Sequence, residues 1–358
     1  MPYSFLLTGG GTGGHVFPAL AVASVLRERG HRLLFAGTRE GMESRLVPDA
    51  GYEMEFIRSG ALNRVGLRRQ FDTAMRLPAG IAGAAQLLRR FRPHAVFSMG
   101  GFVAGPVMIA AALSRIPMIV MEPNAVPGFA NRKIARHVYR ALLGFESAQR
   151  WFPPGRSEVT GLPVRPEFFA LQPSPHEAFT LLITGGSRGA RTLNRASRES
   201  WRFFCDRGAD LRIVHQSGPA EHEALARAFA ESGLKGEVVP FIPDMARAFT
   251  EADLVVARAG AGAVNEIAAA GIPAVLVPLP FAADDHQRKN AQALVDAGAA
   301  RMVPDAALDG QRLFQEVEAL RSDRAALDRM RTLVRHFAHP GAAERAAEVL
   351  EEAAAKRK

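Results

Sequence analysis

The sequence predicts an α/β protein made of two Rossmann-like domains, and two observations support this fold class. A glycine-rich turn at residues 9–15 follows a short apolar segment at 4–8, and a similar turn at 185–190 follows an apolar segment at 179–184. A strand, a glycine turn and a helix open a nucleotide-binding α/β domain, in which free N–H groups at the helix N-terminus attract anions. Finding this unit twice, a domain apart, indicates an enzyme that brings two phosphate-bearing partners together in a cleft between its domains.

Length and composition fit two domains. The chain has 358 residues, and one domain takes about 100–200. Hydrophobic residues make up 48% of the chain, which is sufficient for two buried cores. The single cysteine, Cys205, excludes an internal disulfide and is typical of a reducing cytoplasm. We expect no secretory signal, because the first apolar segment ends at Gly9, and no transmembrane helix, because Arg115 and Pro117 interrupt the most apolar stretch.

Strand and helix patterns alternate along the chain, which favours parallel βαβ units over an antiparallel sheet. In the N-terminal half we expect strands at 4–8, 32–37, 95–98 and 118–121, with helices at 15–29 and about 106–114. In the C-terminal half we expect strands at 179–184, 211–215, 236–240, 253–257 and 273–278, with helices at 191–207, 220–232, 262–270 and 286–297. The tail from 311 to 356 has a helical, charged pattern.

Proline-rich segments at 151–155 and 161–166 suit neither a helix nor a strand, so we expect the junction between the domains there. The chain then divides into an N-terminal domain at 1–160, a C-terminal domain at 161–340 and a final helix at 341–358. Each of the two domains contains one of the glycine turns.

The net charge of +9 is compatible with nucleic acid, an anionic membrane or a phosphorylated substrate. Arginines are concentrated between Arg58 and Arg92, where Asp72 is the one acid and apolar residues interleave with the basic ones. Such a basic amphipathic stretch can lie on an anionic leaflet, and a helix pair with a solvated basic face is the alternative. We expect no nucleic-acid partner, because the sequence shows no basic groove studded with aromatic residues.

The first glycine turn does not fit a dinucleotide site, because no acid ends the second predicted strand, where a ribose would be bound. Gly13 and Gly14 nevertheless let a diphosphate approach the backbone. His15 should lie in the first turn of the helix, where the helix N-terminus disfavours the imidazolium and leaves the neutral form that a general base needs. The alternative is that His15 only hydrogen-bonds a neighbouring loop.

Two more loops follow predicted strands of the N-terminal half. One contains Gly100 and Gly101, and the other contains Glu122 and Asn124. The carboxyl ends of parallel strands form the ligand-binding edge of such a sheet, so we expect these loops to converge with residues 9–15 on one crevice. The alternative is that the glycines only serve tight turns.

In the C-terminal half, residues 258–266 are mostly small and join a strand to a helix, which leaves N–H groups open to a phosphate. Glu266 should lie in the first turn of that helix and accept hydrogen bonds from both hydroxyls of a ribose. The alternative is an acid that only complements the helix dipole. The polar run at 284–290 can bind the hydroxyls of a sugar, but its acids and histidine are too bunched for a metal site.

Together these motifs resemble those of the MurG family, the peptidoglycan glycosyltransferases that use UDP-N-acetylglucosamine. The matching segments lie between residue 5 and about residue 303, at 10–18, 98–102, 185–191, 215–218, 266–271, 285–287 and 290–291. The resemblance implies the GT-B glycosyltransferase fold, with two Rossmann-like domains that face a cleft and a C-terminal helix that crosses back onto the first domain.

The resemblance also implies an activity. N-acetylglucosamine would pass from UDP-N-acetylglucosamine, with inversion, to the 4-hydroxyl of N-acetylmuramyl-pentapeptide on undecaprenyl diphosphate (lipid I), giving lipid II. It implies no cofactor and no metal, because helix N-termini and Arg165 or Arg188 can stabilise the departing UDP. Another GT-B glycolipid glycosyltransferase or a UDP-N-acetylglucosamine epimerase is the alternative enzyme. A basic adaptor is the non-catalytic alternative, against which His15, Glu266 and Gln287 argue.

Residue roles follow from the same resemblance. His15 is the candidate base and Glu122 its rival, while Gly13, Gly14, Gly100 and Gly101 would bind the acceptor diphosphate. The implied donor contacts are Thr12, Gly13, Gly14, Asn124, Arg165, Ser187, Ile242, Ala261, Gly262, Ala263, Val264, Asn265, Glu266 and Gln287.

The resemblance places the protein at the cytoplasmic face of the bacterial plasma membrane as a peripheral protein. The stretch at 62–91 would face the anionic surface, and cell-wall or division proteins are expected partners. The sequence departs from the family pattern at Met121, Pro123 and Leu162. Pro123 removes a backbone donor from its loop.

Overall fold

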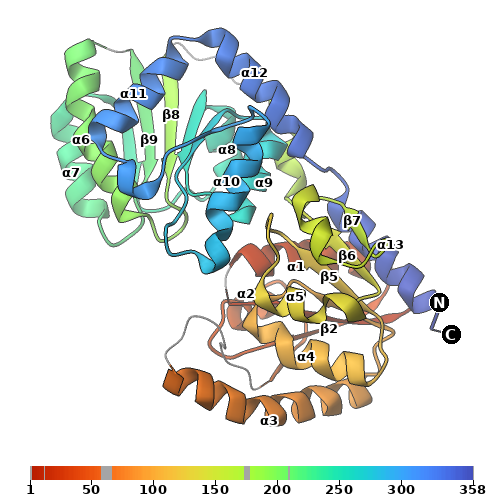
Figure 1. Ribbon diagram of the computed structural model, residues 1–358. Coiled ribbons are helices and arrows are strands. Elements are labelled where there is room, and N and C mark those ends of the chain that lie inside the picture. The colour runs from red at the N-terminus through yellow and green to blue at the C-terminus, as the bar shows by residue number, and fades with distance from the viewer. Residues whose placement is uncertain (1, 12, 58–66, 173–177, 209, 358) are drawn as a thin grey trace. The chain divides into compact units, whose positions relative to one another are not determined.

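The computed structural model describes residues 2–11, 13–57, 67–172, 178–208 and 210–357, and it forms two compact units (Figure 1). Unit 1 comprises Met1–Val164 together with His339–Lys358, and unit 2 comprises Arg165–Ala338. The chain therefore leaves unit 1 at Val164, a few residues after the boundary expected at 160, and returns to it at His339.

Unit 1 contains a parallel sheet of seven strands in the order β3-β2-β1-β4-β5-β6-β7. These strands are β1 (Ser4–Thr8), β2 (Arg32–Gly37), β3 (Met54–Phe56), β4 (Ala95–Ser98), β5 (Met118–Glu122), β6 (Arg140–Leu143) and β7 (Ser157–Val159). Phe5 pairs with Leu33 of β2 on one side and with Ala95 of β4 on the other. The strand order reverses between β1 and β4, and α/β sheets bind ligands at the carboxyl ends of such a strand pair.

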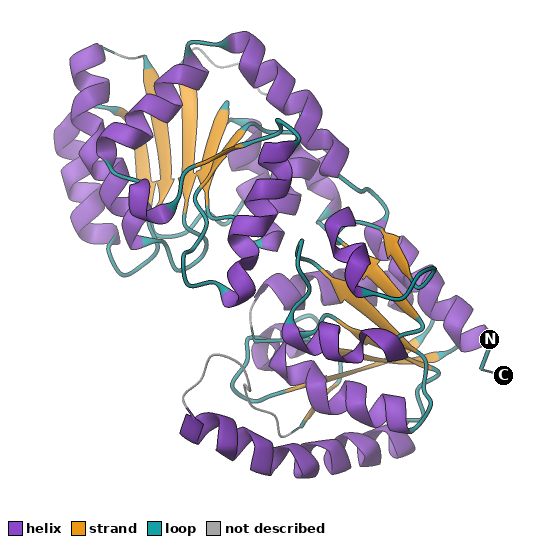
Figure 2. Ribbon diagram, viewed as in Figure 1, coloured by secondary structure: helices purple, strands orange, loops and turns teal. Residues whose placement is uncertain are grey.

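Helices lie along both faces of this sheet (Figure 2). They are α1 (Gly13–Glu28), α2 (Glu43–Asp49), α3 (Leu67–Phe91), α4 (Gly101–Leu113), α5 (Phe129–Ile134) and α13 (Ala342–Ala355), with 3-10 turns η1 (Ala135–His137) and η2 (Glu146–Trp151). α13 packs against α1, and α3 packs against α4. Arg345 of α13 also makes a bidentate ion pair with Glu158, at 2.7 and 3.1 Å.

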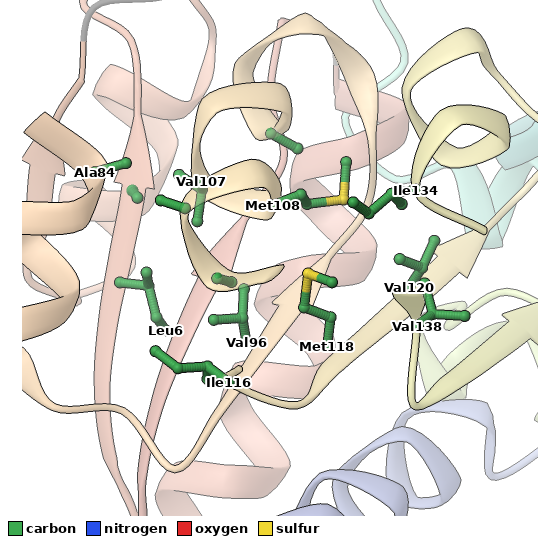
Figure 3. Close-up of a cluster of buried hydrophobic side chains, with 14 of the residues drawn as sticks. Leu6, Ala84, Val96, Val107, Met108, Ile116, Met118, Val120, Ile134 and Val138 are labelled. Atoms are coloured by element: carbon green, nitrogen blue, oxygen red, sulfur yellow. The ribbon is translucent and has the colours of Figure 1, made fainter. Parts of the chain in front are cut away.

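The core of unit 1 lies between the sheet and the layer formed by α3, α4 and α5 (Figure 3). Leu6, Val96 and Val120 point from three adjacent strands toward Val107 and Met108 of α4. All five side chains are buried. These strands are apolar on both faces because helices cover the sheet on both sides.

Unit 2 repeats the arrangement with a parallel sheet of six strands in the order β10-β9-β8-β11-β12-β13. The strands are β8 (Phe179–Thr184), β9 (Leu211–Gln216), β10 (Lys235–Val239), β11 (Leu254–Ala257), β12 (Ala274–Leu276) and β13 (Arg301–Met302). The reversal of strand order falls between β8 and β11. The loops after these two strands are the second glycine turn and the small-residue segment at 258–266.

The helices of unit 2 cover this sheet in the same way (Figure 2). They are α6 (Arg191–Arg207), α7 (His222–Ser232), α8 (Met245–Thr250), α9 (Ala261–Ala270), α10 (His286–Asp296), α11 (Gly310–Arg321) and α12 (Arg324–Val334). Four 3-10 turns accompany them, namely η3 (Pro166–Ala170), η4 (Ala283–Asp285), η5 (Asp305–Ala307) and η6 (Arg335–Phe337).

The predicted fold class is confirmed, while several elements differ from expectation. Short strands such as β6, β7 and β13 are absent from the sequence prediction. The helical pattern predicted for the tail is confirmed, and it divides into separate helices: Asp323 caps α12 by accepting a hydrogen bond from the N–H of Ala326, which starts a new helix after α11.

The basic stretch at 62–91 also differs from expectation. Residues 62–66 lie outside the described part of the chain, and the rest forms the single helix α3 rather than a helix pair. Its last apolar residues, Leu87, Leu88 and Phe91, are buried in the core of unit 1. The last turns of α3 thus have the architecture of an ordinary helix with a solvated basic face.

Candidate active site

Two of the loops predicted to converge in unit 1, those that follow β1 and β4, do meet at the carboxyl end of the sheet. Gly9 packs against Met99, because a Cβ on Gly9 would lie 2.5 Å from the Met99 Cβ. A Cβ on Gly101 would lie 3.3 Å from the carbonyl oxygen of Gly10. The N–H of Met99 donates to the carbonyl of Thr8 at 2.9 Å, which holds the ends of β1 and β4 together.

Asn131 joins the third loop to this pair. Gly100 has a φ of +77°, and a Cβ there would lie 2.8 Å from both the Nδ2 and the Oδ1 of Asn131. Asn131 Nδ2 in turn donates to Glu122 Oε2 at 2.8 Å. The predicted convergence of the three loops is therefore confirmed, and Gly100 is required both for its backbone conformation and for the close approach of Asn131.

Glu122 is a buried brace for its loop, with 1% of its surface exposed. Its Oε1 accepts from the N–H and the Nδ2 of Asn124 at 3.0 and 3.1 Å, and its Oε2 accepts from the N–H of Gly128 at 2.9 Å as well as from Asn131. Burial raises the pKa of Glu122, and these hydrogen bonds oppose that shift. Since Asn124 and Gly128 supply the backbone donors, the missing N–H of Pro123 costs this network nothing. The geometry favours a positioning role for Glu122 over that of rival base.

His15 lies in the first turn of α1, which begins at Gly13. Its side chain is half-buried, and the neighbouring Gly14 is exposed. Thr12 lies outside the described residues. The 16-residue helix α1 therefore presents its N-terminus at the point where the loops of unit 1 converge.

Glu43 is a residue that the sequence analysis missed. Its carboxylate is 1% exposed and accepts from the N–H of Gly11 at 2.8 Å, from the N–H of Thr38 at 3.1 Å and from the Oγ1 of Thr38 at 2.9 Å. A Cβ on Gly10 or on Gly41 would overlap this carboxylate. A single buried acid on α2 thus fixes the glycine turn after β1, and the cluster of glycines at 37, 41 and 9–11 was the available signal.

In unit 2, the glycine turn after β8 is fixed by backbone packing instead. Gly189 has a φ of +71°, and a Cβ there would clash with the carbonyl oxygen of Ser217. A Cβ on Gly218 would clash with the carbonyl oxygen of Arg188. The turn therefore interlocks with residues 217–218, while Ser187 and Arg188 themselves are exposed.

A buried network of neutral groups connects this turn with Ile242. Thr184 Oγ1 accepts from the N–H of Gly186 at 3.1 Å and from Gln216 Nε2 at 3.2 Å. Gln216 Oε1 accepts from the N–H of Ile242 at 2.8 Å. Next to Gln216, burial lowers the pKa of His215 to about 3, so this histidine is neutral. Gln216 is a second positioning residue that the sequence analysis did not identify.

Glu266 lies deeper in its helix than expected. α9 begins at Ala261 after the N-cap Gly260 and has no acid in its first turn, so Glu266 belongs to the second turn. A simple complement to the helix dipole therefore does not explain this acid. Burial raises the pKa of Glu266 to about 7, with Arg165 opposing and Glu167 reinforcing the shift.

The loop before α9 is braced from two sides. Asn290 of α10 donates from its buried Nδ2 to the carbonyl of Ala259 at 3.2 Å. Arg258 directly follows β11 and makes an ion pair with Asp305, which also accepts from Thr192 Oγ1 at 3.0 Å. These contacts fix the backbone just before α9, and so they also fix the position of residues 261–265 at the start of this helix. Asn265 Nδ2 donates to the carbonyl of Ala261 at 2.8 Å.

Gln287 and Arg165 lie at the margins of the unit 2 site. Gln287 Oε1 accepts from the N–H of Leu279 at 3.0 Å, and its Nε2 lies 4.0 Å from where a Cβ on Gly260 would be. Arg165 is paired with Glu167 at 3.1 Å and lines a cavity of about 730 Å³ together with Asp244. Within the described residues, no three His, Cys, Asp or Glu side chains are grouped as a metal site would require.

Comparisons with known proteins cover both units. The N-terminal domain of glycosyltransferase family 28 matches residues 5–143, and the C-terminal domain of the same family matches 180–346. The UDP-N-acetylglucosamine--N-acetylmuramyl-(pentapeptide) pyrophosphoryl-undecaprenol N-acetylglucosamine transferase of Solibacter usitatus is 55% identical over 98% of this chain and 96% of that protein. The protein of the same name from Halorhodospira halophila is 45% identical over 97% and 98%. The crystal structure of Acinetobacter baumannii MurG superposes with a TM-score of 0.81, at 33% identity over 98% of this chain and 100% of that one.

Proposed function

The chain belongs to glycosyltransferase family 28 and, within it, to the MurG family, and from this premise we propose that it converts lipid I to lipid II. N-acetylglucosamine passes from UDP-N-acetylglucosamine to the 4-hydroxyl of N-acetylmuramyl-pentapeptide on undecaprenyl diphosphate. The observation that carries this proposal is the 55% identity, over nearly the whole chain, with a relative named for this transfer. The chain is accordingly a hexosyltransferase.

We assign the donor to unit 2. The N–H groups of Ala261, Gly262 and Ala263 at the start of α9 are oriented to bind a diphosphate, since the first N–H groups of a helix have no partner within it. Glu266, one turn further along, accepts hydrogen bonds from the ribose hydroxyls. The other predicted donor contacts within unit 2 are Arg165, Ser187, Ile242, Val264, Asn265 and Gln287, and those of unit 1 stay predictions.

We assign the acceptor diphosphate to unit 1, where Gly13 and Gly14 open α1 and Gly100 and Gly101 open α4. Two helix N-termini from adjacent loops then face the two phosphates. Asn124, which Glu122 holds in place, borders the same loops.

The reaction is an in-line displacement. The 4-oxygen of the acceptor forms a bond to the anomeric carbon while the bond from that carbon to the phosphate oxygen of UDP breaks. His15, as general base, takes the proton of the hydroxyl, and the transition state has oxocarbenium character. The negative charge gained by UDP is stabilised by the N-terminus of α9 and by Arg165 or Arg188, so the mechanism needs no metal.

We further propose that the protein binds the anionic cytoplasmic face of the plasma membrane peripherally through 62–91. Arg89 and Arg90 are exposed on α3 and supply part of the basic face. Because Leu87, Leu88 and Phe91 are buried, the contact there is electrostatic rather than an insertion of those side chains. In the described part of the chain, no helix is long and apolar enough to cross a membrane. Cell-wall or division proteins stay predicted partners.

The test is transfer of radiolabelled N-acetylglucosamine from UDP to lipid I by the wild type, His15→Ala and Glu266→Ala. We expect lipid II from the wild type, loss of transfer in both variants, and weaker UDP binding in Glu266→Ala alone. Tight UDP binding by the wild type without transfer would reject lipid I as acceptor and favour the epimerase. Full activity of His15→Ala would remove His15 as the base.

A further inference from the structure

Two large apolar side chains are exposed beside the glycine turn of unit 1. Phe17 is 57% exposed and Met42 is 37% exposed. A Cβ on Gly13 would lie 3.0 Å from Phe17 Cε2 and 3.9 Å from Met42 Cε, so both side chains border the first residue of α1. Covering such surfaces with an apolar ligand group is favourable.

Both side chains are held at fixed positions relative to the turn. Phe17 is four residues after Gly13 on the same helix, which places the two on one face. Met42 immediately precedes Glu43, whose carboxylate is hydrogen-bonded to the N–H of Gly11. The exposed pair is therefore tied to the backbone that we assign to the acceptor diphosphate.

A positive charge lies near the same edge of the sheet. Arg39 follows Thr38, whose N–H is bonded to Glu43, and its guanidinium lies 4.6 Å from the ring centroid of Phe56. Arg39 is exposed. This edge of unit 1 thus offers N–H groups and a cation to an anion, and an apolar surface next to them.

We propose that Phe17 and Met42 form a subsite for the first isoprene unit of the polyprenyl diphosphate acceptor. The proposal rests on the proposed function, in which Gly13 and Gly14 bind that diphosphate. The first isoprene carbon is bonded directly to a phosphate oxygen, so it must lie next to whichever groups hold the phosphates. Phe17 and Met42 are exposed and both border Gly13, so they offer the first isoprene unit an apolar surface at this distance from the phosphates.

The experiment compares two soluble acceptors that carry the same muramyl-pentapeptide diphosphate, one esterified with methyl and one with a chain of two isoprene units. Assays are run without membranes or micelles. We expect the wild type to prefer the prenyl acceptor by about tenfold in kcat/KM, equivalent to covering a part of these two side chains. The double variant Phe17→Ser/Met42→Ser should lose this preference and keep its rate with the methyl acceptor and its KM for UDP-N-acetylglucosamine.

Two controls keep the test specific. Leu113→Ser removes another exposed apolar side chain of unit 1, 76% exposed at the end of α4, and should leave the preference unchanged. Phe17→Leu/Met42→Leu keeps an apolar surface and should retain most of the preference. The unchanged rate of the serine double variant with the methyl acceptor excludes a mere loss of fold.

Several outcomes would overturn the subsite. The proposal is wrong if the wild type shows no preference for the prenyl acceptor, or if the serine double variant keeps that preference. An equal loss with both acceptors would mean that the pair contacts the sugar or the diphosphate instead. Absence of transfer to lipid I itself by the wild type would reject the proposed function as well, and this result is distinguishable from the others.

Discussion

The two glycine turns look alike in sequence, yet the molecule fixes them by different means. The turn after β1 is fixed by the carboxylate of Glu43, which lies on a different helix. The turn after β8 interlocks with the backbone at 217–218, and its Gly186 N–H donates to the neutral hydroxyl of Thr184, which also accepts from Gln216. The comparison teaches that the first turn depends on hydrogen bonds to one buried carboxylate, whereas the second depends on close contact between two backbone segments.

The strongest test of this contrast is Gly189→Ala. The added Cβ would meet the carbonyl of Ser217 at a backbone φ of +71°, so we expect unit 2 to lose about 3 kcal/mol or more and UDP binding to fail. Gly208→Ala is the matched control, because Gly208 has a φ of +62° but open space around its Cβ position, and should cost about 1 kcal/mol. Thermal unfolding and calorimetric titration with UDP measure both variants. Equal costs for the two would show that the interlocking of the turn is unimportant.

The corresponding change in unit 1 is Glu43→Gln, which keeps the volume but places an amide where a carboxylate oxygen accepts from Gly11 or Thr38. We expect a loss of about 1–3 kcal/mol in stability and a higher KM for the acceptor, with the KM for UDP-N-acetylglucosamine unchanged. Gly41→Ala should reproduce this pattern, because its Cβ would overlap the Glu43 carboxylate.

Thr38→Val removes one of the three hydrogen bonds to the Glu43 carboxylate and should have a smaller effect. Steady-state kinetics with each substrate varied in turn distinguishes acceptor from donor effects, and a donor-only effect would contradict the assignment.

Glu266 of unit 2 should make donor binding depend on pH. Burial raises the pKa of Glu266 to about 7, so below that pH it is mostly protonated and cannot accept from both ribose hydroxyls. Affinity for UDP should therefore rise about tenfold between pH 6 and pH 8 in the wild type and stay flat in Glu266→Gln. Since the folded-state pKa is above the unfolded value of 4.5, protonated Glu266 stabilises unit 2 below pH 4.5, and this contribution is lost as pH rises toward 7. Calorimetric titration across this range is the measurement, and a flat wild-type profile would exclude Glu266 as the anchor.

The smallest expected effect is that of metal removal. Neither turn uses a metal in the proposed mechanism, because helix N-termini and arginines stabilise the charge of departing UDP. Transfer measured in the presence of excess EDTA should proceed at the rate seen without chelator. A large loss of rate, restored by Mg²⁺ or Mn²⁺, would show that a cation performs the role assigned to these groups.

Sequence patterns predicted the parts of the fold that local chemistry determines. The strands at 4–8, 32–37, 95–98 and 179–184 have the predicted bounds, because each is a continuous apolar run. The short strands β6 and β13 were missed, since so few residues carry no distinctive period. The helical face of Leu87, Leu88 and Phe91 was ambiguous, because a core-facing helix and a membrane-facing one share the same pattern.

In the candidate site, too, features set by the local sequence were predictable and those set by distant contacts were not. The positions of glycines 13, 14, 100 and 101 at the starts of α1 and α4 were predicted because turns at strand ends are visible in sequence. Glu43 and Gln216 were not, because they act through contacts with residues far along the chain or on a neighbouring strand. Glu266 was placed one turn too early, since the N-cap of α9 is a glycine with no capping side chain to mark the start of the helix.

The return of the chain to unit 1 has a consequence for its biosynthesis. Unit 2 is one continuous segment, Arg165–Ala338, and can fold as soon as it has emerged from the ribosome. Unit 1 cannot be completed at that stage, because α1 packs against α13, whose Val349 and Leu350 are fully buried. The unit whose synthesis begins first is therefore completed last, and the surface of α1 that contacts α13 stays uncovered until residues 342–355 have been translated.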